Sequence, residues 1–152
     1  MSISDKSLAA IRQDIKSALT DKLEAATATG EPLEGVGSVH YGEQANLHAV
    51  RFPIVWIIPA AHRPELKGGH TAMHDFTFDF VALTSSQDAA AGREEAEGLQ
   101  ARVYDLITAD RKLGGVVQDV RPLNYDPSHT ATRARHVHYA GCRFAFRITR
   151  RE

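Results

Sequence analysis

The sequence contains a single cysteine, Cys142, and no apolar stretch approaching the roughly 18–20 residues that a membrane-spanning helix needs. A lone cysteine excludes an intrachain disulfide, and its place among alternating apolar residues predicts a buried core position. Residues 1–6 lack the basic and apolar segments of an export signal. We therefore expect a protein that is neither exported nor in contact with a membrane.

Motifs for enzymatic chemistry are also missing. There is no Gly-x-Ser-x-Gly turn to present a nucleophilic serine, and no phosphate-binding loop or dinucleotide fingerprint. The glycine pairs Gly68–Gly69 and Gly114–Gly115 stand alone and predict turns. Asp75 and Asp79 are interpreted as surface residues, because strand surfaces carry carboxylates routinely. The sequence thus predicts a protein that is not an enzyme and uses no cofactor.

Length and composition are those of one ordinary globular domain. The chain has 152 residues, of which 43% are hydrophobic and 24% charged. The net charge is −1, but residues 1–120 carry 11 Lys and Arg against 17 Asp and Glu, whereas residues 121–152 carry seven against two. An uneven distribution with a nearly neutral total favours complementary faces between identical subunits over a nucleic-acid patch.

Two segments show the spacing of three and four between apolar residues that is typical of amphipathic helices. The first extends over residues 4–28, with Ser4 or Ser2 as its N-cap and a glycine and a proline after it. The second follows residues 85–88, which offer N-cap side chains, and ends at residues 113–115.

Five segments predict β-strands. They cover residues 36–41, 54–58, 74–83, 116–121 and 137–149. Phe76, Phe78 and Phe80 alternate with polar residues, which is the period of a half-buried strand. In the last segment, Arg143 and Arg147 are expected to project from the face opposite the apolar side chains.

Two polar stretches, residues 60–73 and 122–135, are longer than a tight turn needs. The first predicts a projecting hairpin loop, and the second a long polar loop. Successive strands without intervening helices favour antiparallel pairing. We therefore predict a single α+β domain over residues 1–152, with an antiparallel β-sheet of four to five strands, two amphipathic helices packed on one face, and a long projecting hairpin loop.

Histidines are the remaining candidates for chemistry. His70 and His74 are four apart, but nearby glycines and β-rich residues argue against a helix that would place both on one face. His136 and His138 would share one face of a strand, and a third imidazole, from His129 or from the polar stretch at residues 60–73, would complete a metal site with them. No cysteine or carboxylate cluster supports this site, so interface histidines are favoured and a small metal-binding protein is an alternative.

The arginine-rich C-terminal segment allows a second alternative, a small nucleic-acid-binding protein. Arginines and an aromatic ring on one sheet are a feature of single-strand binders. The residues concerned are Arg133, Arg135, Tyr139, Arg143 and Arg147. No aromatic ladder accompanies the arginines, so this interpretation ranks second. It predicts an affinity that falls steeply with salt.

From Leu8 to Arg147, the order of these segments resembles that of the tail-terminator, or tail-completion, proteins of long-tailed phages and related tail-like particles. The resemblance lies in the whole-chain pattern and not in a motif. The segments that carry it are the N-terminal amphipathic helix, Pro53–Pro59, Phe76–Phe80, Leu99–Ile107 with Leu113–Val116, and Arg143–Arg147.

This resemblance implies a structural virion protein of the tail or neck, assembled in the host cytoplasm, with no catalytic residue and no cofactor. Six copies of such a protein form a hexameric ring that terminates the tail tube and joins it to the head-neck connector. The implied partners are further copies of the chain, the tail tube protein and the head-tail connector. Another neck or head-closure protein, or an oligomeric protein-binding module, is the alternative.

Within such a ring, the polar stretches at residues 60–73 and 121–135 are expected to touch other subunits or the tube, because long exposed loops usually carry function. The expected charged contacts are Arg63, Lys67, Arg133 and Arg135. Arg143 and Arg147 are expected to line the lumen and to meet the phosphate backbone of passing DNA without reading its bases.

Overall fold

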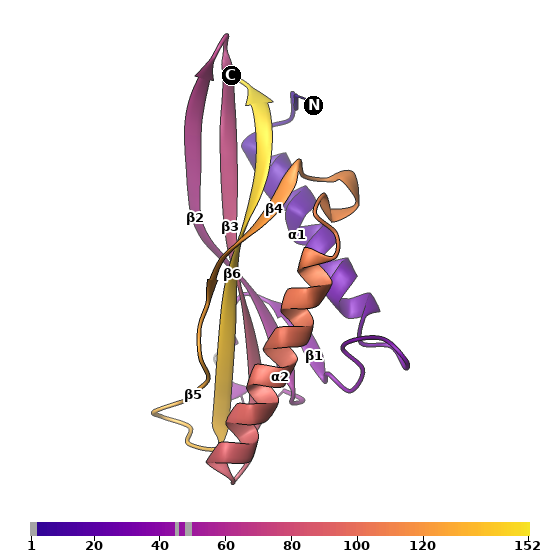
Figure 1. Ribbon diagram of the computed structural model, residues 1–152, viewed down its shortest axis with the longest axis vertical. Helices are drawn as coiled ribbons and strands as arrows, with labels where there is room; N and C mark the ends of the chain where they lie inside the picture. Colours follow the sequence, from indigo (N-terminus) through magenta and orange to yellow (C-terminus); the bar gives the residue numbers. More distant parts are fainter. Residues whose placement is uncertain (1–2, 45, 48–49) are drawn as a thin grey trace.

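A computed structural model describes residues 3–44, 46–47 and 50–152 (Figure 1). Within them it contains helices α1 (Leu8–Ala25) and α2 (Ala89–Thr108), a short 3-10 helix, η2 (Leu113–Gly115), and six strands. The strands are β1 (Ser38–Tyr41), β2 (Ile54–Gly68), β3 (Thr71–Ser85), β4 (Asp119–Tyr125), β5 (His129–Thr130) and β6 (Val137–Arg151). The predicted α+β class is confirmed.

The strands form one sheet in the order β1-β2-β3-β6-β4, with β5 also paired to β6. This sheet has six strands instead of the predicted four to five, and it is mixed, because β1 pairs in parallel with β2. Residues 42–53 separate β1 from β2 in the sequence, and this length permits a parallel pairing, which a two-residue hairpin would not. The pairings of β3 with β2 and of β6 with β3, β4 and β5 are antiparallel, as predicted.

Both helices pack on one face of the sheet, as predicted. The buried apolar residues of α1 are Ile11, Ile15, Leu19 and Leu23, and those of α2 include Leu99, Val103 and Ile107. They form one core with Phe76, Phe78, Phe80, Phe144 and Phe146. Burying each such side chain contributes about 1.5–3 kcal/mol. Cys142 lies in this core at 2% exposure, and burial raises the pKa of its thiol to about 12.

A side-chain cap marks the N-terminal end of each long helix. The N-cap of α1 is Ser7, whose Oγ accepts a hydrogen bond from the Ala10 backbone N–H at 3.1 Å. The predicted cap Ser4 is wrong because its backbone pairs with β6 instead, donating to the Thr149 carbonyl at 2.9 Å. The alternative cap, Ser2, lies outside the described residues. Asp88 caps α2, within the predicted segment.

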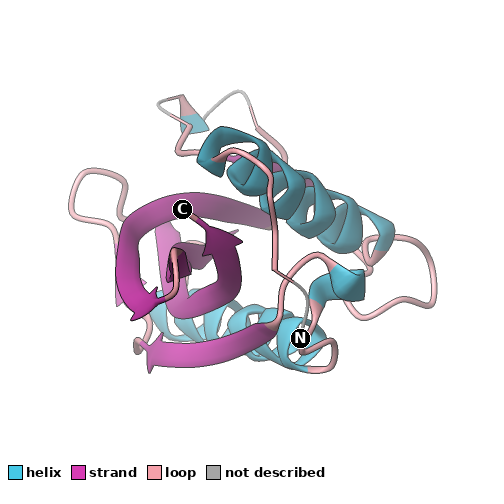
Figure 2. Cartoon of the chain, turned by 90° about the horizontal axis from the view of Figure 1, so that it is seen from above, coloured by secondary structure: helices cyan, strands magenta, loops and turns pink. Residues whose placement is uncertain are grey.

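The predicted loop over residues 60–73 is a pair of strands. Strands β2 and β3 continue to the pair Gly68 and Thr71, and Gly68, Gly69 and His70 turn the chain with positive φ angles. We call residues 59–68, 71–78 and 144–151 of β2, β3 and β6 the arm. It extends past the N-terminal end of α1, and its strands curl around the long axis of the molecule (Figures 1 and 2).

Strand β2 tolerates prolines because no other strand of the described residues lies beside its outer side along the arm. Its pairing with β1 covers only Ile54–Ile57, so Pro59 and Pro64 lie on an edge, where a missing N–H donor costs little. A register shift between Pro59 and His62 also changes which residues face the helices. Ile57 faces them before the shift, and His62 lies against Phe76 after it.

The second predicted loop, residues 122–135, is also partly strand. Strand β4 continues through Pro122 to Tyr125, and β5 pairs with β6. The predicted strand over residues 116–121 starts too early, because Val116 and Val117 follow η2 and only Asp119 begins the pairing. Pro122 again lies on an outer strand, which explains why a proline does not end the ladder.

Gly92 on α2 allows a close approach to the buried His138. A Cβ at Gly92 would lie 2.1 Å from His138 Cδ2, whereas a Cβ at Gly98 on the same helix would meet open space. His138 is held in place by Thr130 Oγ1 and by the Ser86 carbonyl, each at 3.0 Å.

We expect Gly92→Ala to lower the free energy of unfolding by about 1–3 kcal/mol, because the new methyl group overpacks the site. Gly98→Ala is the matched control and should raise it by up to about 1 kcal/mol, because alanine favours the helix. Urea denaturation of both variants checks this. Equal stabilities would show that His138 is not fixed against α2.

Candidate interaction surfaces

The face of the sheet opposite the helices carries cross-strand ion pairs. Arg143 on β6 binds Asp79 on β3 through two hydrogen bonds of 2.6 and 2.9 Å. Arg147 binds Asp75 in the same way, at 2.9 and 3.0 Å. Each pair consists of direct neighbours in the β3–β6 register. Both arginines therefore project from the face that the alternation of the strand predicts, and Asp75 and Asp79, interpreted as simple surface residues, are their partners.

Asp75 is surrounded by arginines from three strands. Besides Arg147, it accepts a hydrogen bond from Arg121 Nη2 on β4 at 3.2 Å, and Arg63 on β2 lies opposite it in the register. Burial opposes ionisation, but the hydrogen bonds and charge of Arg147, with the charges of Arg121 and Arg63, hold the pKa of Asp75 below its usual value. Three arginines around one carboxylate leave an excess of positive charge.

The arginines of this face differ in how many of their hydrogen-bond donors are already used. The guanidinium groups of Arg143 and Arg147 are occupied by carboxylates, and their side chains are 45% and 25% exposed. Arg121 makes a single bond to Asp75, and its Nε is buried without a hydrogen-bond partner. The excess charge is thus centred on Arg63 and Arg121.

We expect Asp75→Asn to lower the free energy of unfolding by about 1–3 kcal/mol, because it leaves partly buried arginines without a counter-charge. Asp119→Asn is the control, since the Asp119 side chain in its pair with Arg111 is 38% exposed, and it should cost less than about 1 kcal/mol. Chemical denaturation of the two variants measures the difference. Equal losses would show that the cluster around Asp75 contributes no more than a surface pair.

The four predicted contact residues lie in two separate places. Arg63 and Lys67 are exposed on the arm, where Lys67 pairs with Glu65 at 3.0 Å. Arg133 and Arg135 are exposed in the connection between β5 and β6. Figure 1 shows this connection at the opposite end of the molecule from the tip of the arm. The chain therefore presents basic side chains at both ends.

The histidines of the metal-binding alternative do not converge. His138 is buried on the side of the sheet that faces α2, whereas His129 contacts Tyr139, with ring centroids 5.5 Å apart. Adjacent residues on β6 point to opposite faces, so His129 and His138 lie on different sides of the sheet. Among the described residues, no group of three or more His, Cys, Asp and Glu side chains is arranged to hold a metal ion.

A chain of hydrogen bonds through two histidines crosses the arm on its helix side. His62 Nε2 lies 2.8 Å from His74 Nδ1, and His74 Nε2 lies 2.7 Å from Glu152 Oε1. The carboxylate of Glu152 can only accept, so His74 donates to it through Nε2. The chain links β2, β3 and the C-terminus. Sequence reasoning missed it, because only the strand register brings residues 62 and 152 together.

The surroundings of His62 disfavour its charged form. Its ring stacks on Phe76, with centroids 4.3 Å apart, and Arg12 lies over the same phenylalanine. Burial, followed by the positive charges of His74, Arg12 and Arg150, lowers the pKa of His62.

A lowered pKa means that the unfolded chain takes up a proton at position 62 more readily than the folded protein does. The stability that neutral His62 contributes is therefore present above the unfolded pKa of about 6.5 and is lost as the pH falls below it. We expect His62→Phe to reduce the fall in unfolding free energy between about pH 7 and 5, as measured by urea denaturation at several pH values. His129→Phe, outside this hydrogen-bond chain, is the control. An unchanged pH dependence in His62→Phe would contradict the assignment.

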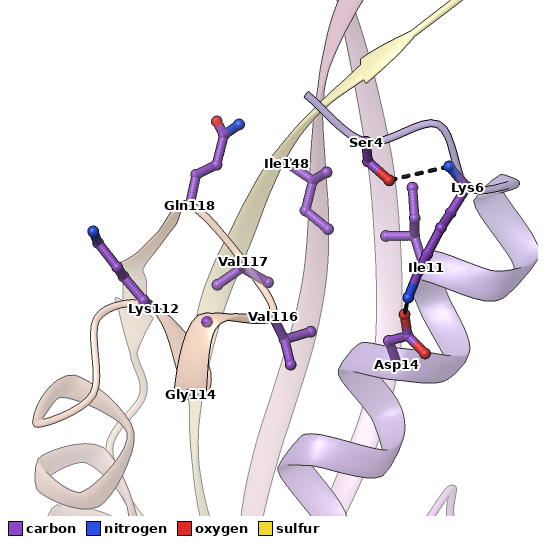
Figure 3. A pocket seen from close by; sticks show the side chains of 11 residues that line it. Ser4, Lys6, Ile11, Asp14, Lys112, Gly114, Val116, Val117, Gln118 and Ile148 are labelled. Carbon is purple, nitrogen blue, oxygen red and sulfur yellow. Dashed lines mark hydrogen bonds and ion pairs between the residues drawn. The ribbon is translucent and has the colours of Figure 1, made fainter. Parts of the chain in front are cut away.

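A groove with a volume of about 790 Å³ lies between the start of α1, the η2–β4 connection and β6. Ile11, Val117 and Ile148 are among its apolar lining residues and are 2–6% exposed. Figure 3 shows Lys112 on one side of these residues and Asp14 on the other. Asp14 pairs with Lys6 at 2.6 Å.

No protein-family model matches this sequence, and no curated protein matches it significantly. None of the described helices is long and apolar enough to cross a membrane. The arm, the ion-paired face and the groove are the surfaces that the molecule offers for contact with other molecules.

Proposed function

We propose that this protein is a structural virion protein that forms a ring, terminates a phage tail tube and joins the tube to the head-neck connector. The α+β fold with two helices on one face of the sheet agrees with the fold that the tail-terminator resemblance implies. A ring requires that one patch of each subunit meets a different patch of the next. The exposed zones at opposite ends of the molecule give each copy two different patches, as such heterologous contacts require.

The arm is the observation that carries this proposal. Its strands continue beyond the N-terminal end of α1, and every residue from Arg63 to His70 is exposed. Ordering a residue costs about 1–2 kcal/mol of backbone entropy, and the exposed tip returns little by burial in the monomer. The arm's tip is an ordered element that the core does not need, and this supports a role in contacting another molecule.

Within the ring, we assign subunit or tube contacts to Arg63 and Lys67 on the arm and to Arg133 and Arg135 at the other end. Salt weakens attraction between exposed charges, so these contacts should set the specificity and rate of assembly more than its final strength.

The face opposite the helices is the proposed wall of the lumen, with Arg143 and Arg147 on it. Any contact with passing DNA there would be to phosphates and independent of sequence. The pairing of both arginines with Asp79 and Asp75 reduces the net charge of this wall. Such a wall would let DNA pass instead of holding it.

The first test is the mass of the purified protein by light scattering, followed by negative-stain imaging with tail tubes. We expect particles of about six copies of the 16.7 kDa chain, or a cap at one end of each tube. Binding to isolated connectors but not to tubes would favour a neck or head-closure protein. A protein that stays monomeric and binds neither tubes nor connectors would contradict the proposal.

A charge-reversal variant tests the assigned contacts. Arg133→Glu with Arg135→Glu should reduce ring formation or capping without changing the melting temperature, because both side chains are exposed. Arg102→Glu, at an exposed arginine on α2, is the matched control and should assemble normally. Unimpaired assembly of the double variant would remove this zone from the interface.

A further inference from the structure

We infer that the tip of the arm of one copy docks into the groove of Figure 3 on a second copy, with Leu66 entering the groove. This inference rests on the proposed ring and names the contact that would close it.

Leu66 is the most exposed large hydrophobic side chain of the described residues, at 81% exposure. It is held in position by strand pairing with Ala72, two residues before the glycine turn that begins at Gly68. Single exposed leucines are common on protein surfaces. This one differs because it stands at the tip of an ordered arm, where it can reach a concave site on another molecule.

The groove provides an apolar floor for such a side chain. Ile11, Val117 and Ile148 contribute to its lining, and Val116 is half-buried beside them. Its volume of about 790 Å³ lies in the range of about 300–1,000 Å³ that is common for binding clefts. Because the floor residues are already nearly buried, the apolar surface that docking removes from water would be mainly that of Leu66 and of the half-buried Val116, and this burial favours association.

Charges at the tip complement those at the mouth of the groove. Glu65 and Lys67 flank Leu66 and project from the opposite face of the strand. When Leu66 points into the groove, they would therefore stay outside it, near its mouth. Lys112 and Asp14 stand on opposite sides of the groove. Among the described residues Lys112 makes no ion pair, and the exposed Glu65–Lys67 and Lys6–Asp14 pairs are weak enough to be exchanged for contacts across the groove.

Docking through side chains also agrees with the composition of the β2 edge. Pro59 and Pro64 remove backbone donors there, and Lys67 adds a charge near the tip, features that discourage pairing with a further strand. The tip and the groove are different patches present on every copy. Their contact is therefore heterologous and can repeat around a ring.

Cysteine cross-linking tests the contact directly. A chain carrying Leu66→Cys and Val116→Cys should form, on mild oxidation of rings or tube caps, a ladder of covalent oligomers up to the full ring. Each single variant should give dimers at most. The natural Cys142 does not interfere, because it is 2% exposed and its thiol is kept protonated.

Leu66→Lys provides an independent measurement. It should raise the protein concentration at which half of the chains are assembled by about tenfold or more, because a charge replaces the buried apolar group. Leu66→Met is the control and should assemble as the unmodified protein does, since it keeps an apolar side chain of similar volume. Position 66 is exposed, so neither change should alter the fold.

The outcomes separate this inference from the proposed function. Rings or caps that form normally without cross-links, and that tolerate Leu66→Lys, would overturn the docking contact and leave the ring in place. An unmodified protein that forms neither rings nor caps would overturn both.

Discussion

The pairing of β3 with β6 is the constraint on which the other features of the molecule depend. It runs without a register shift from Thr71 opposite Arg151 to Ser85 opposite Val137. Alternate residues of both strands therefore point the same way along the whole sheet. One face supplies the phenylalanines that pack under α1 and α2, and the other supplies the ion pairs. A slip of one residue would exchange the two faces, so burial of the phenylalanines also fixes the charge pairs.

The same pairing explains how the arm stays ordered where the helices end. Strand β6 accompanies β3 to the tip, so the arm is a three-stranded ribbon along most of its length and not an isolated hairpin. On the helix side, the aromatic packing of the core is continued by His62 stacked on Phe76 and by the buried His74. The hydrogen bond from His74 to Glu152 ties the C-terminus to this layer.

Sequence periodicity predicted the elements that these forces dominate. Phe76–Phe80 and the last strand alternate regularly because one face is buried along their whole length, and both were predicted near their true limits. Residues 60–73 were predicted as a loop because β2 is an exposed edge there and its register shift after Pro59 breaks the alternation. The two-residue strand β5 leaves no periodic signal at all. The His62–His74–Glu152 contact and the groove bring together residues that are far apart in the sequence, so local sequence patterns do not reveal them.

Stability and contact are divided between different parts of the molecule. The core between the helices and the sheet buries the large apolar side chains, whereas the tip of the arm and the loop with Arg133 and Arg135 contribute exposed residues. Contacts with partners can therefore be altered at these positions while the fold is retained. Because the net charge of the chain is only −1, copies do not repel each other strongly at long range. Local complementarity can then hold copies together. The tip presents Leu66 between two charges, and the groove presents apolar side chains between two charges.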